Sequence, residues 1–189
     1  KDNCYFTLSV ENQVRLDRAQ SSGAVELVAQ VGDQSHFGPL QFKGNGSVRE
    51  SYLRRLIPWD EGDCFRREKI EIYKSTLLQS GLFAQAEVIL PEDGPQSDGS
   101  IPMTLSLKER AQRTIGAGLT YYSDEGPGGV INWEHRNFLG AAENFKGELM
   151  LSSLKQSLSA DFKKPFFMRQ DQDLFLNAAL RRQDTDAFE

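Results

Sequence analysis

The sequence predicts an α+β module followed by the first antiparallel strands of an outer-membrane β-barrel. In Thr114–Tyr122, apolar side chains fall on one face of a strand, and Thr or Gly falls on the other. Similar alternating segments continue to Arg182 without helical spacing between them. Walls of outer-membrane barrels have this pattern, with apolar side chains toward lipid and polar ones toward the lumen. Residues 35–110 instead mix strand and helix periodicities, which indicates a separate α+β module.

The composition excludes several classes of protein. The chain has 189 residues and a net charge of −5, and it has no dense Lys/Arg cluster of the kind that binds nucleic acid. No run approaches the ~20 apolar residues of a transmembrane helix. The chain begins at Lys1 in a charged, strand-like segment and ends at Glu189 just after another strand. We therefore expect a fragment of a longer protein.

The first 34 residues indicate two strands, Tyr5–Leu16 and Ala24–Val31, joined by the polar segment Arg18–Gly23. The two cysteines, Cys4 and Cys64, fit no metal-ligand spacing. They could pair in an oxidising compartment or remain two separate thiols, and the sequence leaves both readings open.

Residues 35–110 predict the order β-α-α-β-β. Ser47 with Glu50 three residues later has the spacing of a capping box at the start of the first helix. Pro58 ends that helix, and Ser80-Gly81 ends the second. The predicted elements are a strand at Gly38–Phe42, helices at Val48–Ile57 and Arg66–Gln79, and strands at Ala84–Leu90 and Ile101–Lys108, the last two separated by the acidic loop Pro91–Ser100.

Residues 111–189 predict long strands in up-and-down order. Charge facing lipid near the midplane costs ~2–4 kcal/mol for Arg or Lys, so Glu134, Arg136, Lys146 and Glu148 should face the lumen. A soluble β-sandwich is the alternative, although several segments exceed the usual strand length of globular proteins. The predicted strands are Thr114–Tyr122, Gly129–Phe138, Asn144–Leu154, Gln156–Lys164 and Asp171–Arg182, with a Gly-Pro-Gly-Gly turn region at Gly126–Gly129.

A weak internal repeat links the first strands to the module. Tyr5-Phe6 parallels Leu82-Phe83 at a shift near 78 residues, and Val10 parallels Val88. The shift equals the size of one module, which favours tandem repetition. We therefore interpret residues 1–34 as the last two strands of a truncated first copy and residues 35–110 as a complete second copy.

Several segments together resemble a known family. Phe37–Asn45 resembles the first strand of a polypeptide-transport-associated (POTRA) domain, and Leu78–Val88 resembles the end of its second helix and its second strand. Gly118–Pro127 and Trp133–Gly140 resemble the first two barrel strands of the POTRA-barrel outer-membrane assembly family, and Ala160–Phe167 resembles a later strand end. Within that family the chain is most similar to TamA, the translocation and assembly module subunit, whereas BamA and the two-partner secretion transporters are more distant.

The chain also departs from the family pattern. Cys4 stands where the family has a glycine before Tyr5-Phe6, and the C-terminal barrel strands and the inward-folded loop are absent. Residues 111–189 are therefore expected to be the N-terminal strands of an incomplete transmembrane barrel.

The resemblance implies sites where other polypeptides add as strands, because a free strand edge exposes unpaired N–H and C=O groups. Gly116 and Gly118 would either ease bending of the gate strand or fit a tight lumen. Candidate residues are Ala84, Ala86, Val88 and Leu90 for a client-binding edge strand, Thr114, Gly116, Gly118, Leu119 and Thr120 for a lateral gate strand, and Tyr121, Trp133, Phe138 and Phe166 for membrane-interface aromatics.

The implied function is assembly or translocation of outer-membrane proteins, as in autotransporter biogenesis. The expected partners are unfolded outer-membrane or autotransporter polypeptides, the membrane, and a periplasm-spanning or inner-membrane protein of the TamB type. The expected location is the outer membrane with the POTRA part in the periplasm. His36 and His135 lack companions at metal-ligand or catalytic spacing, so we expect neither enzymatic activity nor a metal or cofactor. A two-partner secretion pore and a passive structural surface antigen are the alternatives.

Overall fold

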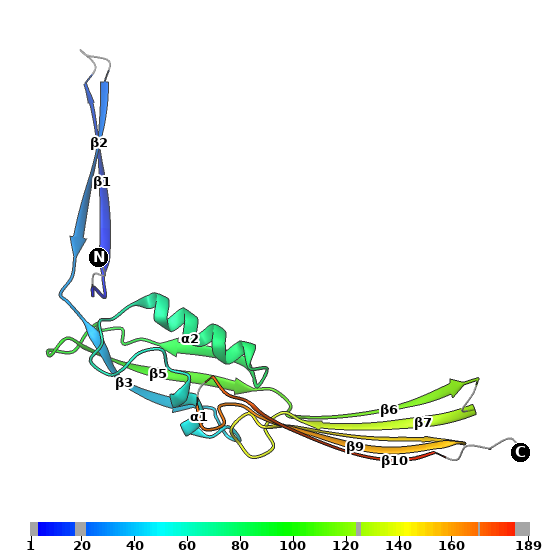
Figure 1. The fold of residues 1–189 in the computed structure, drawn as a ribbon. Helices are drawn as coiled ribbons and strands as arrows, with labels where there is room; N and C mark the ends of the chain where they lie inside the picture. Colours follow the sequence, from blue (N-terminus) through cyan, green and yellow to red (C-terminus); the bar gives the residue numbers. More distant parts are fainter. Residues whose placement is uncertain (1–3, 18–21, 124–125, 170, 184–189) are drawn as a thin grey trace, which may run out of the picture. The chain divides into compact units, whose positions relative to one another are not determined.

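The computed structural model describes residues 4–17, 22–123, 126–169 and 171–183, and the strands form three sheets (Figure 1). The chain divides into two compact units. One comprises residues 1–43, 57–74 and 87–106, and the other comprises residues 44–56, 75–86 and 107–189.

The first sheet is a two-stranded antiparallel hairpin of β1 (Leu8–Asp17) and β2 (Ser22–Val31), drawn in blue in Figure 1. The predicted first strand starts three residues too early, because β1 begins at Leu8 and Tyr5 forms an isolated bridge with Gln34 outside it. The predicted connection falls partly on residues 18–21, outside the described residues. Val14 pairs with Val25 on one face, and these side chains are 60% and 65% exposed. The hairpin therefore presents an uncovered apolar face.

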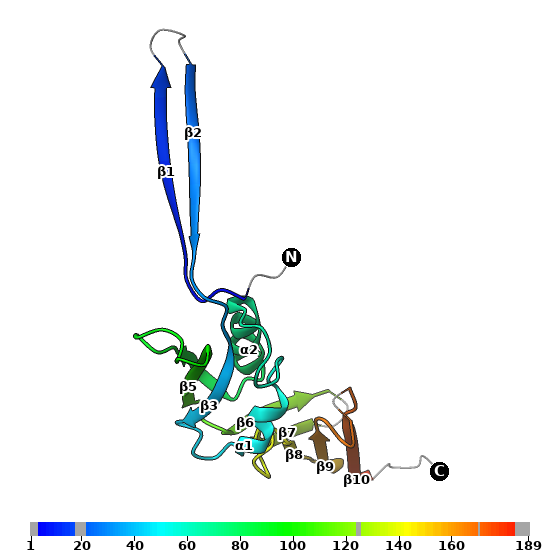
Figure 2. The same cartoon turned by 90° about the vertical axis from the view of Figure 1, so that its left-hand side faces the viewer.

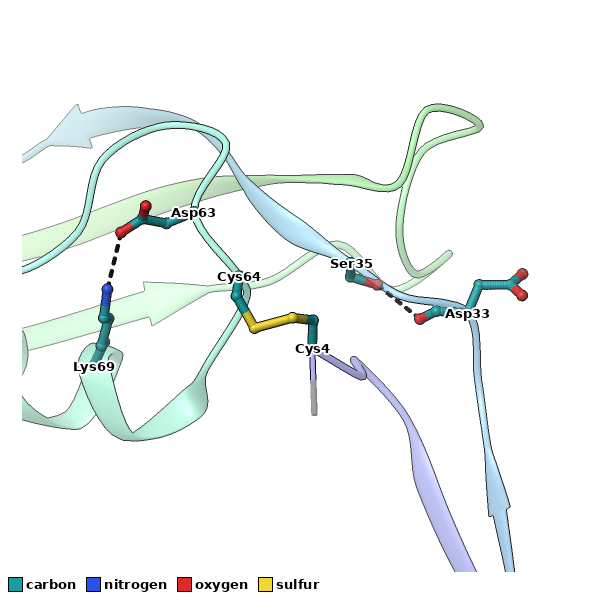
Figure 3. The surroundings of a disulfide bond; sticks show 6 residues. All are labelled: Cys4, Asp33, Ser35, Asp63, Cys64 and Lys69. Carbon is teal, nitrogen blue, oxygen red and sulfur yellow. Dashed lines mark hydrogen bonds and ion pairs between the residues drawn. A yellow bond between two sulfur atoms is a disulfide. The ribbon is translucent and has the colours of Figure 1, made fainter. Parts of the chain in front are cut away.

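Cys4 and Cys64 form a disulfide, which resolves the alternative that the sequence left open (Figure 3). The bond lies beside Ser35, whose N–H donates to the Cys4 carbonyl at 2.6 Å. His36 forms an isolated bridge with Cys64, so the two cysteines flank one stretch of chain. The Phe6 ring packs 5.6 Å from the Phe65 ring, centroid to centroid. The disulfide thus ties the base of the hairpin to the residues that precede α2 (Arg67–Gln79).

Reduction of this disulfide is expected to lower the free energy of unfolding. The bond closes a loop with a sequence separation of 60 residues, and loops of that size contribute up to about 4 kcal/mol by restricting the unfolded chain. The check is thermal or urea unfolding of the protein with and without reductant, followed by tryptophan fluorescence. A Cys4→Ser/Cys64→Ser variant should have the same free energy of unfolding as the reduced protein, and reductant should not change it. Equal stability of the oxidised and reduced forms would contradict the expected contribution.

The second sheet belongs to the predicted β-α-α-β-β domain, whose order the structure confirms. The sheet runs β3-β5-β4, with β3 parallel to β5. None of the helices in the described part of the chain is long and apolar enough to span a membrane. The elements are β3 (His36–Lys43), α1 (Glu50–Arg55), α2 (Arg67–Gln79), β4 (Phe83–Ile89) and β5 (Ser100–Glu109).

Aromatic rings make up much of the core in the part of this domain that lies in the first unit. Phe37 stacks on Trp59 with 4.5 Å between ring centroids, and it also contacts Phe65 at 5.1 Å. Trp59 meets Tyr73 edge-on at 5.4 Å. All four side chains are at most 8% exposed. Burial of such large apolar surfaces is the main stabilising contribution to a domain of this size.

The first helix is shorter than predicted, and its N-cap was assigned wrongly. The predicted helix was Val48–Ile57, whereas α1 covers Glu50–Arg55 with Arg49 at the N-cap and no side-chain capping bond. Ser47 is instead held by Glu109 at the end of β5. The N–H groups of Ser47 and Val48 therefore donate to the carboxylate of Glu109 in a distant strand, and not to the nearby Glu50 of the predicted capping box.

The third sheet has the order β10-β9-β8-β7-β6, all antiparallel, and Figure 2 shows these labels in sequence across it. Four strands have ten residues and β8 has nine. These lengths match the 9–11 residues of a tilted membrane-spanning strand. The strands are β6 (Arg113–Tyr122), β7 (Gly126–His135), β8 (Asn144–Ser152), β9 (Lys155–Lys164) and β10 (Leu174–Gln183).

The predicted turn at Gly126–Gly129 is wrong, because these residues begin β7. Tyr121 pairs with Pro127 and Tyr122 with Gly126. Pairing of β7 with β8 starts only at Gly128, so Pro127 needs no N–H on the β8 side. A Cβ at Gly128 would lie 2.8 Å from the Leu151 carbonyl oxygen, so close packing against β8 explains a glycine there.

Candidate strand-pairing edges

The predicted gate strand β6 lies at an edge of the five-stranded sheet. Among the described residues it pairs only with β7, from Arg113 opposite His135 to Tyr122 opposite Gly126. In an antiparallel ladder, alternate residues turn their N–H and C=O groups away from the one partner. Those groups on the outer side of β6 can accept another strand.

The two faces of this sheet differ in polarity as predicted. Directly paired residues share a face, so the register defines rows across the five strands. The two central rows of one face contain no charged residue. They are Ile115, Trp133, Gly147, Ala160 and Ala178 in one row, and Ala117, Ile131, Leu149, Leu158 and Leu180 in the next. Leu119 on the same face of β6 is 95% exposed. An apolar face this open suits contact with lipid.

The opposite face carries the charges that the sequence assigned to a lumen. Thr114, Glu134, Lys146 and Asp161 form one row. The Glu134 carboxylate accepts a hydrogen bond from Asn144 at 2.9 Å and forms ion pairs with Arg136 at 3.0 Å and Lys146 at 3.6 Å. A cavity of about 350 Å³ lies over this row. The face is therefore polar and internally hydrogen-bonded, as a water-filled lumen requires.

Among the predicted gate-strand residues, Gly116 and Gly118 face neighbouring side chains on the polar face. A Cβ at Gly116 would overlap Oδ1 of Asn132, and one at Gly118 would lie 3.3 Å from a Val130 methyl group. Neither glycine has a left-handed backbone. The hydroxyl of Thr120 is buried on the same face. Crowding by neighbouring side chains is therefore severe at Gly116 and slight at Gly118.

The second candidate edge, β4, lies at the edge of the three-stranded sheet next to β5. Ala84 is exposed, Val88 is half-buried, and Ala86 is buried in the domain. Leu90 follows directly after the strand, which ends at Ile89.

The outer edge of β3, on the other side of this sheet, is partly occupied. The Phe37 N–H donates to the Asp63 carbonyl at 2.8 Å, and the Phe37 carbonyl accepts the Gly62 N–H at 2.8 Å. A hydrogen bond from Lys69 lowers the pKa of the Asp63 carboxyl, which belongs to the same loop. Among the described residues, β4 is therefore the more accessible edge of the sheet.

The predicted interface aromatics lie in different places. Trp133, His135, Phe138 and Phe145 form one ring cluster at the His135 end of β7, with Phe138 stacked 5.2 Å from Phe145. Tyr121 lies near the opposite end of the sheet and is 77% exposed. Phe166 packs on Tyr52 with 5.9 Å between ring centroids.

Sequence reasoning missed the residues that hold the segment before α1, namely Glu109, Asn137 and Gly140. In the sequence, Asn137 and Gly140 stand out only as members of a family motif. Glu109 is one of several charged residues near the end of a strand pattern, with nothing to mark it as a tertiary contact. Their partners in residues 47–49 are about 60 to 90 positions away in the chain. The one local signal was Asn137-Phe138-Leu139-Gly140, because Asn and Gly favour structured turns.

The fold and its edges define a class of protein: an α+β domain followed by the sheet of an outer-membrane barrel. Residues 35–110 match the POTRA family model, described as a surface antigen variable number repeat, so this part is a POTRA domain. The chain is 21% identical over 174 residues to a Treponema pallidum (strain Nichols) protein named as a candidate outer membrane protein assembly factor. That alignment covers 88% of this chain and 20% of the relative.

Two solved structures share the fold. BamA from Haemophilus ducreyi lacking POTRA domains 1–3 superposes with a TM-score of 0.84 at 21% identity, over 99% of this chain and 35% of that one. CdiB from Acinetobacter baumannii gives a TM-score of 0.57 at 16% identity, over 98% of this chain and 34% of that one. The chain thus spans about a third of these structures and a fifth of the curated relative.

These findings confirm the predicted fold class, a POTRA domain followed by antiparallel strands like those of the BamA barrel. They show that the chain is similar to proteins of the outer-membrane assembly family. They also support the expected location, the bacterial outer membrane with the POTRA part in the periplasm.

Proposed function

We propose that this chain captures unfolded β-rich outer-membrane polypeptides and templates their insertion into the membrane. The observation that carries the proposal is the edge position of β6, which pairs only with β7 among the described residues. A client strand that pairs with β6 satisfies its backbone groups there before they meet lipid, where each unpaired group costs several kcal/mol. The edge strand β4 supplies an earlier contact in the periplasm.

The energetics make capture reversible and insertion directional. In water a hydrogen bond contributes only about 0.5–1.5 kcal/mol net, so a client strand held at β4 can still dissociate. At β6 the alternative to pairing is bare backbone in hydrocarbon, which is far less favourable. The difference between the two surroundings drives the client from β4 to β6 without ATP or a cofactor.

The finer assignment is a TamA-like role in autotransporter biogenesis, together with a TamB-like periplasm-spanning partner. It rests on the sequence resemblance described above. In this scheme residues 1–34 end a preceding POTRA copy, whose helices cover the apolar face of the β1–β2 hairpin. A two-partner secretion pore is the second candidate, because the fold is also that of CdiB.

Site-specific photocrosslinking tests the proposal. A photoreactive amino acid at Leu119 should crosslink to a stalled autotransporter or barrel client in cells. The same amino acid at Leu149, on the same face but two strands from the edge, should crosslink far less, because neighbouring strands lie ~4.8 Å apart. Equal yields at both positions would reject β6 as the pairing edge. Crosslinks to a single dedicated passenger alone would favour the secretion pore, and no crosslinks to any client would favour a passive surface antigen.

A further inference from the structure

The residues that lead into α1 are anchored to the β7–β8 loop. The backbone N–H of Arg49, at the N-cap of α1, donates to the Gly140 carbonyl at 2.7 Å. Asn137 donates through Nδ2 to the Ser47 carbonyl at 3.0 Å and to the Ser47 hydroxyl at 3.3 Å. These three bonds join positions about 90 residues apart in the sequence.

The β7–β8 loop is preorganised for this contact. Asn137 is 4% exposed, and its Oδ1 accepts the Ala142 N–H at 3.0 Å. Glu143 is 2% exposed, and its carboxylate accepts the Ala141 N–H at 2.8 Å. Gly140 has a φ of 95°, and a Cβ there would lie 3.0 Å from the Arg49 side chain. A loop with so many internal bonds offers Asn137 and Gly140 as fixed hydrogen-bonding groups.

The same segment is held from the other side by Glu109, the last residue of β5. Its Oε1 accepts the N–H groups of Ser47 at 2.9 Å and Val48 at 3.0 Å, and its Oε2 accepts the Ser47 hydroxyl. Glu109 comes shortly before β6, which begins at Arg113. Between them, the Gln112 carbonyl accepts the Arg136 N–H at 2.9 Å. Ser47 is therefore bonded both to the chain that enters β6 and to the chain that leaves β7.

The β9–β10 turn contacts the other end of α1. The Phe166 carbonyl accepts a hydrogen bond from Arg55 at 3.1 Å, and the Phe166 ring packs on Tyr52. Phe166 has a left-handed backbone with a φ of 55°. Burial raises the pKa of the Tyr52 hydroxyl, and a hydrogen bond with Ser80 acts in the opposite direction. Two turns of the sheet thus meet α1 at its two ends.

We propose that residues 47–55, which we call the latch segment, hold the Arg113 end of β6 in place, and that Glu109 and Asn137 are its positioning residues. This inference rests on the proposed function, because it assigns a controlling contact to the gate strand of that function. Release of the latch segment loosens both Glu109, which leads into β6, and the β7–β8 loop, which follows the strand paired with β6.

Two substitutions test the latch segment. Asn137→Asp keeps an oxygen that accepts the Ala142 N–H but removes the donor to Ser47 and places a carboxylate against the Ser47 carbonyl. Glu109→Ala removes all three acceptor contacts, whereas Glu109→Gln keeps an acceptor for the two backbone N–H groups. Asn12→Asp, the same chemical change at an exposed position of β1, is the matched control.

The readout is hydrogen exchange by mass spectrometry on the intact protein in phospholipid nanodiscs. Asn137→Asp and Glu109→Ala should speed exchange about tenfold in peptides covering residues 47–55 and the Arg113–Ala117 half of β6, because each loses two or more hydrogen bonds to the latch segment. The Gly118–Tyr122 half should keep its rate. Glu109→Gln should restore much of the protection, and Asn12→Asp should behave as wild type.

The outcomes separate this inference from the proposed function. Faster exchange confined to residues 47–55 and 136–143, with β6 unchanged, would overturn the positioning role and leave only a structural contact. Faster exchange throughout the chain would also overturn it, because that indicates general loss of stability. Client crosslinking from Leu119 in the wild-type protein is scored independently, so its absence rejects the proposed function whatever the exchange data show.

Discussion

A disulfide that locks β6 to the strand closing the barrel in the intact protein should abolish client insertion. Position 119 suits one of the two cysteines (Leu119→Cys), because the Leu119 side chain is 95% exposed and belongs to the edge strand β6. Once the outer edge of β6 is permanently paired, a client strand must insert with unpaired backbone groups, each costing several kcal/mol in lipid. A free-energy cost of 1.4 kcal/mol changes an equilibrium constant by a factor of about ten. Even one unpaired backbone group in lipid should therefore lower insertion at least about tenfold.

The measurement is insertion of an autotransporter or barrel client into proteoliposomes, scored by protease protection. Reductant should restore insertion by the locked protein. The parent protein treated with the same reductant controls for loss of the native Cys4–Cys64 bond. The Leu119→Cys variant without its partner cysteine controls for the substitution itself. Full insertion by the oxidised, locked protein would show that clients enter without pairing to β6.

The sheet and the two faces of β6 could be predicted because their signal is local. Alternation in Thr114–Tyr122 depends only on the two-residue period of a strand, and the observed register places the same side chains on the same faces. The errors arose where a local signal was ambiguous. Gly126–Gly129 has turn composition. The same residues nevertheless suit a strand, because Gly128 packs closely against Leu151 and Pro127 lies before the pairing with β8 begins.

The latch contacts could not be predicted because they depend on the fold itself. Ser47 has a suitable partner three residues away in Glu50, so the sequence favours a capping box. In the structure Glu109, which is 62 positions away, accepts the same kind of hydrogen bond. Nothing in the strand pattern of residues 100–109 distinguishes that carboxylate from a solvated one. Tertiary contacts of this kind replace local capping when the folded chain brings a better acceptor.

A proline in the outer edge of β4 should reduce capture of clients at the POTRA domain without unfolding it. Strand residues alternate in the side toward which their N–H groups point, so Glu87 and Val88 direct theirs to opposite sides of β4. The N–H group of one residue bonds with β5, and the N–H group of the other points away from the sheet. Proline removes the N–H group at either position, but only one substitution breaks the sheet.

The pair of variants Glu87→Pro and Val88→Pro therefore contains its own control. Thermal unfolding identifies which variant keeps the sheet intact, and that variant should lose several-fold in client crosslinking to the POTRA domain, since a removed hydrogen bond contributes about 0.5–1.5 kcal/mol. Crosslinking from Leu119 in β6 should fall less, because the substitution leaves the backbone of β6 unchanged. If the stable variant captures clients as well as wild type, recognition at the POTRA domain does not use the backbone of β4. Side-chain contacts such as those of Ile89, which is 52% exposed, would then have to explain it.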